Sequence, residues 1–87
     1  MKSTLKNFRA NVLYASEAAG ISQQELARRS GVHFVTINRI LRGVQDPGIQ
    51  RCERIAAGLG IPLRDLIIEP TRFSKMFLTD IIGDDKV

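Results

Sequence analysis

The first twenty residues of the chain carry apolar side chains at intervals of three or four residues. This spacing puts them on one face of a helix and leaves the opposite face polar. The pattern predicts a helix over about residues 4–19, capped at its N-terminus by Ser3 or Thr4. The positions expected to face the core are Leu5, Phe8, Val12, Ala15 and Ala19.

Residues 22–43, with the sequence SQQELARRSGVHFVTINRILRG, predict two short helices joined by a glycine turn. Ser22 is a favourable N-cap, and Glu25 follows it at the spacing of a capping box. Gly31 marks the end of the first of these helices, because glycine adopts a positive φ without steric cost. The two helices are expected at about 23–30 and 34–42, and the second should bury Ile37, Ile40 and Leu41.

The next segment predicts two further helices. A fourth helix is expected at about 49–58. Pro62 suits the first position of a fifth, which runs to about Ile68, and Pro70 is expected to end this body. Residues 1–69 are therefore predicted to form one all-α domain, a compact five-helix bundle. The core face of the fourth helix is predicted to consist of Ile49, Cys52, Ile55, Ala56 and Leu59.

Residues 70–87 form a tail that the pattern leaves open between helix and strand. Thr71 is a candidate cap for a helix, and the run of residues 77–82 equally suits a strand. The helix is favoured, and residues 83–87 are expected to be frayed. In a helical tail one face would hold Phe73, Met76, Phe77 and Ile81.

Two short helices joined by a tight glycine turn form the scaffold that places one helix in the DNA major groove. The segment resembles the helix-turn-helix of lambda-repressor-like (Xre/Cro-type) DNA-binding domains, which implies that fold for about residues 8–68. The matching residues of the helix-turn-helix are Gly20, Ile21, Ser22, Gln23, Leu26, Ala27, Gly31, Val32, Ile37 and Gly43. Those at the family's fourth and fifth helices are Pro47, Ile55, Ala56, Leu59, Gly60, Ile61, Leu63 and Leu66.

In such a scaffold the helix at about 34–42 presents its first turns to base edges. Arg39 has two donors for guanine O6 and N7, and Asn38 is suited to adenine. Phe34 and Val35 lack hydrogen-bonding side chains, so they are candidates for contact with thymine methyl groups. For Phe34, packing in the core is the alternative, because it precedes Ile37 by three residues.

Other residues are candidates for phosphate contact. The family uses a glutamine at the start of its second helix as a clamp on the DNA backbone, and Gln23 matches it. His33 is either a phosphate contact or, as the favoured alternative, a surface residue and a mediocre cap. Arg28 is a further candidate for DNA contact, with support of Phe34 as its alternative. The remaining phosphate candidates are Thr36, Arg42 and Gln45.

The charge of the chain is consistent with a polyanionic partner. The formal net charge is +4, and residues 1–72 hold eleven Lys and Arg against six Asp and Glu, or +5. This excess is modest and fits a solvated surface as well, so it supports DNA binding only together with the scaffold.

The composition argues against several other classes of protein. One cysteine and one histidine cannot form a structural zinc site. No nucleophile, base and acid occur at a catalytic spacing, and no glycine-rich phosphate loop is present, so neither an enzyme nor a cofactor is expected. The longest apolar stretch is too short to span a bilayer, and no signal peptide is apparent. A cytoplasmic, nucleoid-associated protein of prokaryotic or phage origin is expected.

Helix one departs from the family pattern by two apolar residues at positions that are usually polar. We hypothesise that the tail covers them, either within one chain or across a dimer interface. The residues of this hypothesis are Leu13, Tyr14, Phe73, Met76, Phe77 and Ile81.

The leading functional prediction is a sequence-specific transcriptional regulator, most plausibly a repressor that binds a two-fold operator as a homodimer. The alternative is an antitoxin that binds DNA and neutralises a toxin through its tail. A third hypothesis is a relative in fold only, which binds protein instead of DNA; the apolar Phe34 and Val35 are its best support.

Overall fold

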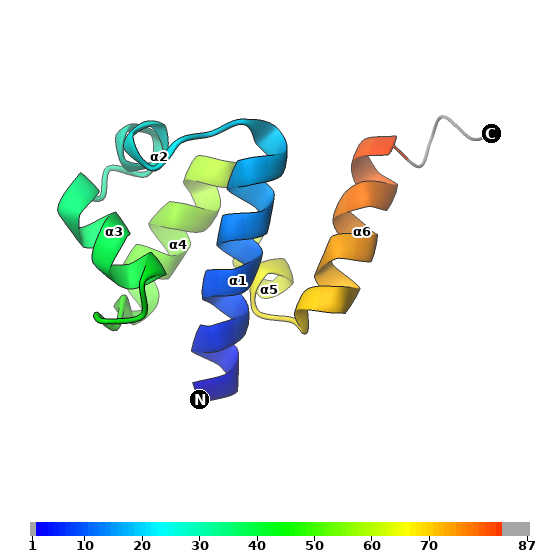
Figure 1. Cartoon of the computed structure of the whole chain (residues 1–87), viewed down its shortest axis with the longest axis horizontal. Coiled ribbons are helices and arrows are strands. Elements are labelled where there is room, and N and C mark those ends of the chain that lie inside the picture. The colour runs from blue at the N-terminus through cyan, green and yellow to red at the C-terminus, as the bar shows by residue number, and fades with distance from the viewer. Residues whose placement is uncertain (1, 83–87) are drawn as a thin grey trace.

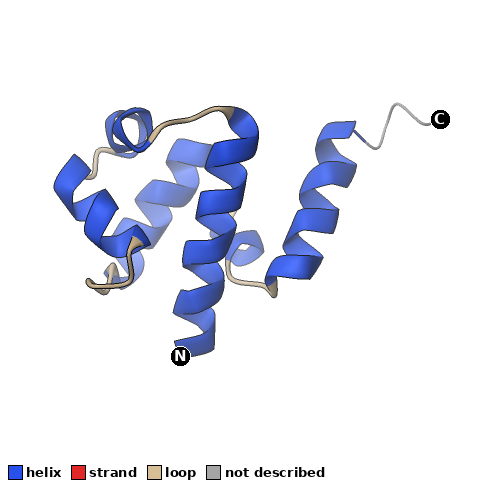
Figure 2. Ribbon diagram, viewed as in Figure 1, coloured by secondary structure: helices blue, strands red, loops and turns tan. Residues whose placement is uncertain are grey.

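The computed structural model describes the backbone of residues 2–82 and the side chains of residues 3–78. Within these limits the chain is built from helices and connecting loops, with no strand (Figure 2). The all-α prediction is therefore confirmed for the described residues. The helices are α1 (Lys2–Ala19), α2 (Gln23–Ser30), α3 (Phe34–Leu41), α4 (Gly48–Leu59), α5 (Leu63–Leu66) and α6 (Pro70–Ile82).

The described residues form six helices, one more than the predicted five-helix bundle, because the tail, for which a helix was favoured, forms α6. Pro70 begins α6 instead of ending the folded body, and residues 77–82 are helical, which excludes the strand alternative. Proline suits the first turn of a helix because its φ is already helical and its missing N–H would have no partner there. Glu69, not Thr71, serves the N-terminus: its Oε1 accepts a hydrogen bond from the Arg72 N–H at 3.4 Å. The prediction for residues 83–87 lies outside the described residues.

α1 stands in the middle of the molecule (Figure 1). α2 and α3 lie on one side of it with α4 behind, and α6 runs alongside it on the other. The shared core contains residues from α1 to α6, so α6 belongs to the same hydrophobic cluster as the other five helices. Its buried members are Phe8, Val12, Ala15, Leu26, Val32, Ile37, Ile40, Leu41, Cys52, Ile55, Ala56, Leu66 and Phe73.

An aromatic cluster attaches α6 to α1. Phe73 is only 2% exposed. The ring of Tyr14 meets those of Phe73 and Phe77 edge-on, with centroids 6.1 and 5.6 Å apart. Leu13 and Tyr14 are partly buried against the core. The tail thus covers Tyr14 within one chain, as one version of the hypothesis predicted. Met76 is half-buried, and the side chain of Ile81 lies outside the described set.

Two asparagines of α1 hold the junction between α5 and α6. The buried Asn11 amide donates hydrogen bonds of 2.9 Å to the carbonyls of Leu66 and Ile68. The Asn7 amide donates to the Ile67 carbonyl at 3.2 Å. Carbonyls at the end of a helix lack intrahelical partners, and these side chains supply them. α1 therefore fixes the point at which the chain turns into α6.

The contact between α2 and α4 depends on a residue without a side chain. A Cβ at Gly58 would lie 3.1 Å from the Ser30 backbone nitrogen and 3.2 Å from the Ser30 Cβ. Gly58 therefore allows α4 to pack directly on the C-terminal end of α2.

Two residues predicted to face the core are exposed. Ile49 is 65% exposed because it lies in the first turn of α4, one turn before that helix enters the core at Cys52. Ala19 is exposed at the last position of α1. Helical periodicity identifies the face on which a residue lies but not how far the neighbouring helices reach along it.

We predict that Phe73→Ala lowers the free energy of unfolding by about 3 kcal/mol, because it leaves a cavity between α6 and α1. Leu78→Ala on the same helix is the matched control: Leu78 is 46% exposed, so its truncation should change stability by less than about 1 kcal/mol. Urea unfolding monitored by circular dichroism measures both. A loss of stability in Phe73→Ala as small as that in Leu78→Ala would show that α6 is not part of the core.

Candidate nucleic-acid interface

The turn between α2 and α3 forms as the sequence predicts. Gly31 has a φ of 72°, and its N–H donates to the Ala27 carbonyl at 2.9 Å. The buried Ser30 accepts a hydrogen bond from the Val32 N–H at 3.2 Å through its Oγ. Val32 is 5% exposed and anchors the turn in the core. The turn is thus held by both hydrogen bonds and packing, which fixes the angle between the two helices.

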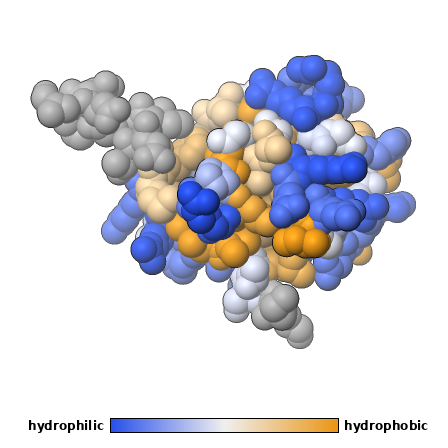
Figure 3. All heavy atoms as spheres, turned by 180° about the vertical axis from the view of Figure 1, so that it is seen from behind, coloured by the Kyte–Doolittle hydropathy of each residue, from blue (hydrophilic) through white to orange (hydrophobic). Residues whose placement is uncertain are grey.

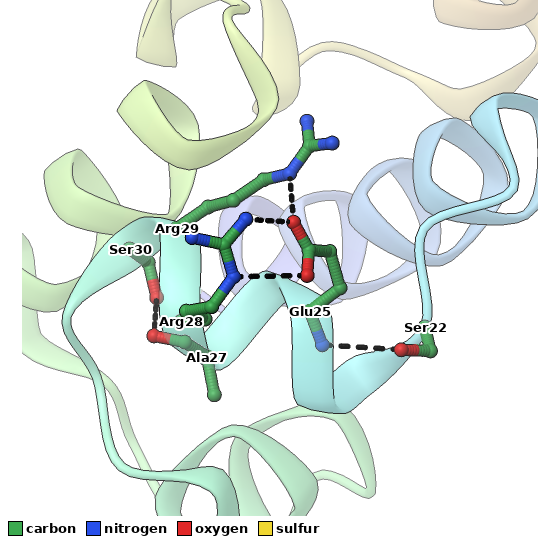
Figure 4. Close-up of polar contacts among 6 residues, drawn as sticks. All are labelled: Ser22, Glu25, Ala27, Arg28, Arg29 and Ser30. Carbon is green, nitrogen blue, oxygen red and sulfur yellow. Dashed lines mark hydrogen bonds and ion pairs between the residues drawn. The ribbon is translucent and has the colours of Figure 1, made fainter.

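The N-terminus of α2 has only half of the predicted capping box. The Ser22 Oγ accepts a hydrogen bond from the Glu25 N–H at 3.1 Å. In a full capping box the Glu25 carboxylate would bind back to the Ser22 N–H. Here that carboxylate accepts hydrogen bonds from Arg28 and Arg29 on the next turn, so one anion holds two cations (Figure 4).

This arrangement shifts the titration of Glu25. The pKa of the carboxyl falls from 4.5 to about 2, first because of the hydrogen bond from Arg28 and then because of that from Arg29. The same contact raises the pKa of Arg28 above its usual value. Arg28, a candidate DNA contact, is therefore paired along α2, although its side chain remains 72% exposed.

α3 is divided between a buried face and an exposed face. Ile37, Ile40 and Leu41 are buried, as predicted. Phe34 is 40% exposed and Val35 is 44% exposed, so the alternative that Phe34 packs in the core is wrong. Arg39 is exposed further along the same helix. The exposed face therefore combines apolar residues in its first turn with a cation in its last.

Asn38 links the two helices instead of projecting freely. Its Nδ2 donates a hydrogen bond of 3.2 Å to the Oε1 of Gln23, the first residue of α2. Its Oδ1 accepts from the Nη1 of Arg42 at 3.5 Å. To read adenine, Asn38 needs both its Nδ2 donor and its Oδ1 acceptor. Direct reading of adenine by Asn38 therefore requires that its contacts with Gln23 and Arg42 open.

Sequence reasoning missed this bridge because it joins residues that are fifteen positions apart. The signal was present only indirectly: a helix-turn-helix brings the start of its first helix close to the middle of its second.

Val44 is a further residue that was not predicted, being 64% exposed in the loop directly after α3. No pattern in the sequence distinguishes it from an ordinary loop residue.

His33 forms the N-cap of α3. Its Nδ1 accepts a hydrogen bond from the Val35 N–H at 3.2 Å, which confirms the capping alternative. A neutral imidazole that accepts through Nδ1 carries its proton on Nε2. His33 is exposed, so this Nε2–H is available to a phosphate oxygen. Arg42 is also exposed, whereas Thr36 and Gln45 are half-buried.

No group of three or more His, Cys, Asp or Glu is placed to hold a metal ion among the residues with described positions. Within the same part of the chain, every helix is too short or too polar to cross a membrane.

We predict that Glu25→Gln lowers stability at neutral pH and that this difference disappears in acid. A carboxyl whose pKa is lowered by folding stabilises the fold above its unfolded pKa, near 4.5, and loses that effect as the pH falls through about 2. Urea unfolding of wild type and variant across this range measures the effect. Glu17→Gln on α1 removes the same charge at an exposed site and is the control. A difference that stays constant with pH would contradict the ion pair.

Comparison with known protein families agrees with this geometry. A family model described as helix-turn-helix, of the lambda-repressor-like (Xre) type, matches residues 15–66, which is more than half of the chain. Neither the search of curated proteins nor that of solved structures gives a match. The matched segment begins within α1 and ends with α5, so it includes the turn at Gly31 and all of α3. The protein therefore belongs to the helix-turn-helix family of DNA-binding regulators.

Proposed function

We propose that the protein is a sequence-specific transcriptional repressor that inserts α3 into the DNA major groove. The observation that carries this proposal is the exposed face of α3. Phe34, Val35 and Arg39 are exposed on this short helix, whose other face is buried in the core. A single helix fits the major groove and presents three or four side chains to base edges.

The proposed base contacts combine two kinds of recognition. Arg39 would donate two hydrogen bonds to a guanine, the commonest specific contact in the major groove. Phe34 and Val35 would pack on thymine methyl groups, which distinguish thymine from cytosine without hydrogen bonds. Their exposure of 40% and 44% gives them the necessary reach. The apolar contacts of Phe34 and Val35 with thymine, next to the contact of Arg39 with guanine, would favour a site that contains both T·A and G·C pairs.

The proposed phosphate contacts lie around this face. Gln23 stands at the N-terminus of α2, where free N–H groups and the helix dipole favour an anion. His33 would donate through Nε2, and Arg42 would add a cation at the C-terminal end of α3. Thr36 and Gln45 are half-buried and complete the proposed set.

Binding as a homodimer would supply the selectivity that a single module lacks. One domain of this size contacts few base pairs, and two linked domains add their binding free energies. Recognition helices about 34 Å apart would occupy two half-sites on one face of the DNA. Selection of bound sequences from a random DNA pool tests the proposal directly. A two-fold consensus supports it, whereas recovery of no consensus at low salt contradicts it.

We predict that Arg39→Ala weakens binding to the selected site by about 1–3 kcal/mol and relaxes specificity at one base pair. Arg72→Ala is the matched control, because it removes the same charge from an exposed position on α6. Titration of the selected site and of its single-base variants measures both effects. An equal loss on selected and random DNA would assign Arg39 to the phosphate backbone.

We further predict that Asn38→Ala lowers affinity by about 1 kcal/mol on every sequence, because Gln23 and Arg42 lose the amide that positions them. A double-mutant cycle with Gln23→Ala should show coupling, with a combined loss smaller than the sum of the single losses. A loss confined to one A·T pair would instead show that Asn38 reads adenine directly.

A further inference from the structure

A pocket with a volume of about 280 Å³ lies between the second half of α6 and the rest of the bundle. It is bordered by the C-terminal ends of α1 and α4, which are the upper ends of both helices in Figure 1. Figure 3 shows hydrophobic side chains gathered in the lower middle of the opposite face, and the pocket is separate from them. The residues that line the pocket are Ala15, Ala19, Ile21, Leu59, Gly60, Ile61 and Phe77.

The pocket is open because small residues occupy positions where large ones would close it. Ala15 and Ala19 lie one turn apart at the end of α1, and Gly60 follows the last residue of α4. A Cβ at Gly60 would meet no atom within 4 Å. Protein interiors hold few voids larger than a water molecule, so an apolar hollow of this size between packed helices is unusual. α6 is thus docked closely at Phe73, whereas the pocket opens beside Phe77, one turn further along.

The wall of the pocket selects a small uncharged ligand. Every residue that lines it is apolar or glycine, and none of the described side chains at the pocket carries a charge. A charged group placed there would lose its water without gaining an ion pair. Ile21, Leu59 and Ile61 are only partly exposed, so the wall is recessed and does not project from the surface. A recessed apolar wall suits a small molecule better than the surface of another protein.

Phe77 favours an aromatic ligand. Its ring centroid lies 5.6 Å from that of Tyr14 and 5.8 Å from that of Phe73, so the pocket borders a cluster of three rings. A ring bound in the pocket would contact Phe77 and add a fourth member, and aromatic pairs gain more than their buried area alone provides. An apolar cavity of about 150 Å³ is sufficient for benzene. The pocket therefore has room for a molecule of one or two rings.

The residues that follow α6 in the sequence are unsuited to fill the pocket, because three of residues 83–87 are charged. We infer that the pocket binds a small, uncharged aromatic molecule that holds α6 against the ends of α1 and α4. Such a ligand would contact Phe77 on one side and Ala19 and Ile61 on the other, so it stabilises the docked position of α6. None of the lining residues is a proposed DNA contact, and the inference is independent of the proposed function.

The test uses the full chain without DNA. Toluene is the probe, and benzoate, which carries a carboxylate in place of the methyl group, is its charged counterpart. We expect toluene to shift the amide NMR signals of Ile21, Ile61 and Phe77 in a saturable manner, and benzoate at the same concentration to leave them unchanged. Toluene at about ten times its Kd should also raise the Tm by about 5 °C, because it binds only the folded chain.

Two matched variants test the location of the site. Ala19→Phe places a ring in the pocket and should weaken toluene binding at least about tenfold. Ala18→Phe adds the same ring to the neighbouring residue, which does not line the pocket, and should bind toluene as the wild type does. Both alanines are exposed on α1, so both variants should fold, and circular dichroism checks this.

Three results would overturn the inference: no saturable shift in the wild type, shifts that map to another part of the chain, or equal binding of toluene and benzoate. Normal binding by a folded Ala19→Phe variant would also overturn it. The wild-type map decides the question by itself if Ala19→Phe does not fold. A protein that binds toluene in the pocket but selects no DNA sequence would contradict only the proposed function.

Discussion

The packing of α1 against four other helices is the contact on which the remaining structure depends. α1 touches α3, α4, α5 and α6. Phe8 and Val12 enter the core, Asn7 and Asn11 bind the carbonyls after α5, and Tyr14 receives α6. A chain of 87 residues can bury only a limited fraction of its surface. Here one central helix, α1, supplies contacts to most of the other helices.

The sequence predicts the helix-turn-helix well because the signals for it are local. Ser22 and Gly31 act through hydrogen bonds and backbone conformation within a few residues, so α2 occurs at its predicted bounds. The start of α6 was harder to predict, because proline both ends helices and begins them. The choice at Pro70 depends on Glu69 and on where Asn11 holds the preceding carbonyls. Ile49 was misplaced for a similar reason, since its exposure depends on how far the neighbouring helices reach along the first turn of α4.

The candidate site was predictable in its location but not in its internal contacts. Exposure of Val35 and Arg39 follows from the spacing of the buried isoleucines on α3. The engagement of Asn38 by Gln23 and the pairing of Arg28 with Glu25 follow from side-chain geometry that no spacing rule contains. They change the electrostatics of the site, because Glu25 offsets part of the positive charge that Arg28 and Arg29 give to α2.

The aromatic cluster between α1 and α6 has a spectroscopic consequence. The chain contains one tyrosine and no tryptophan, so Tyr14 dominates its fluorescence when the protein is excited in the near ultraviolet. That ring lies between α1 and α6, in edge contact with Phe73 and Phe77. The native emission of the unlabelled protein therefore provides an optical signal that responds to the docking of α6 on α1.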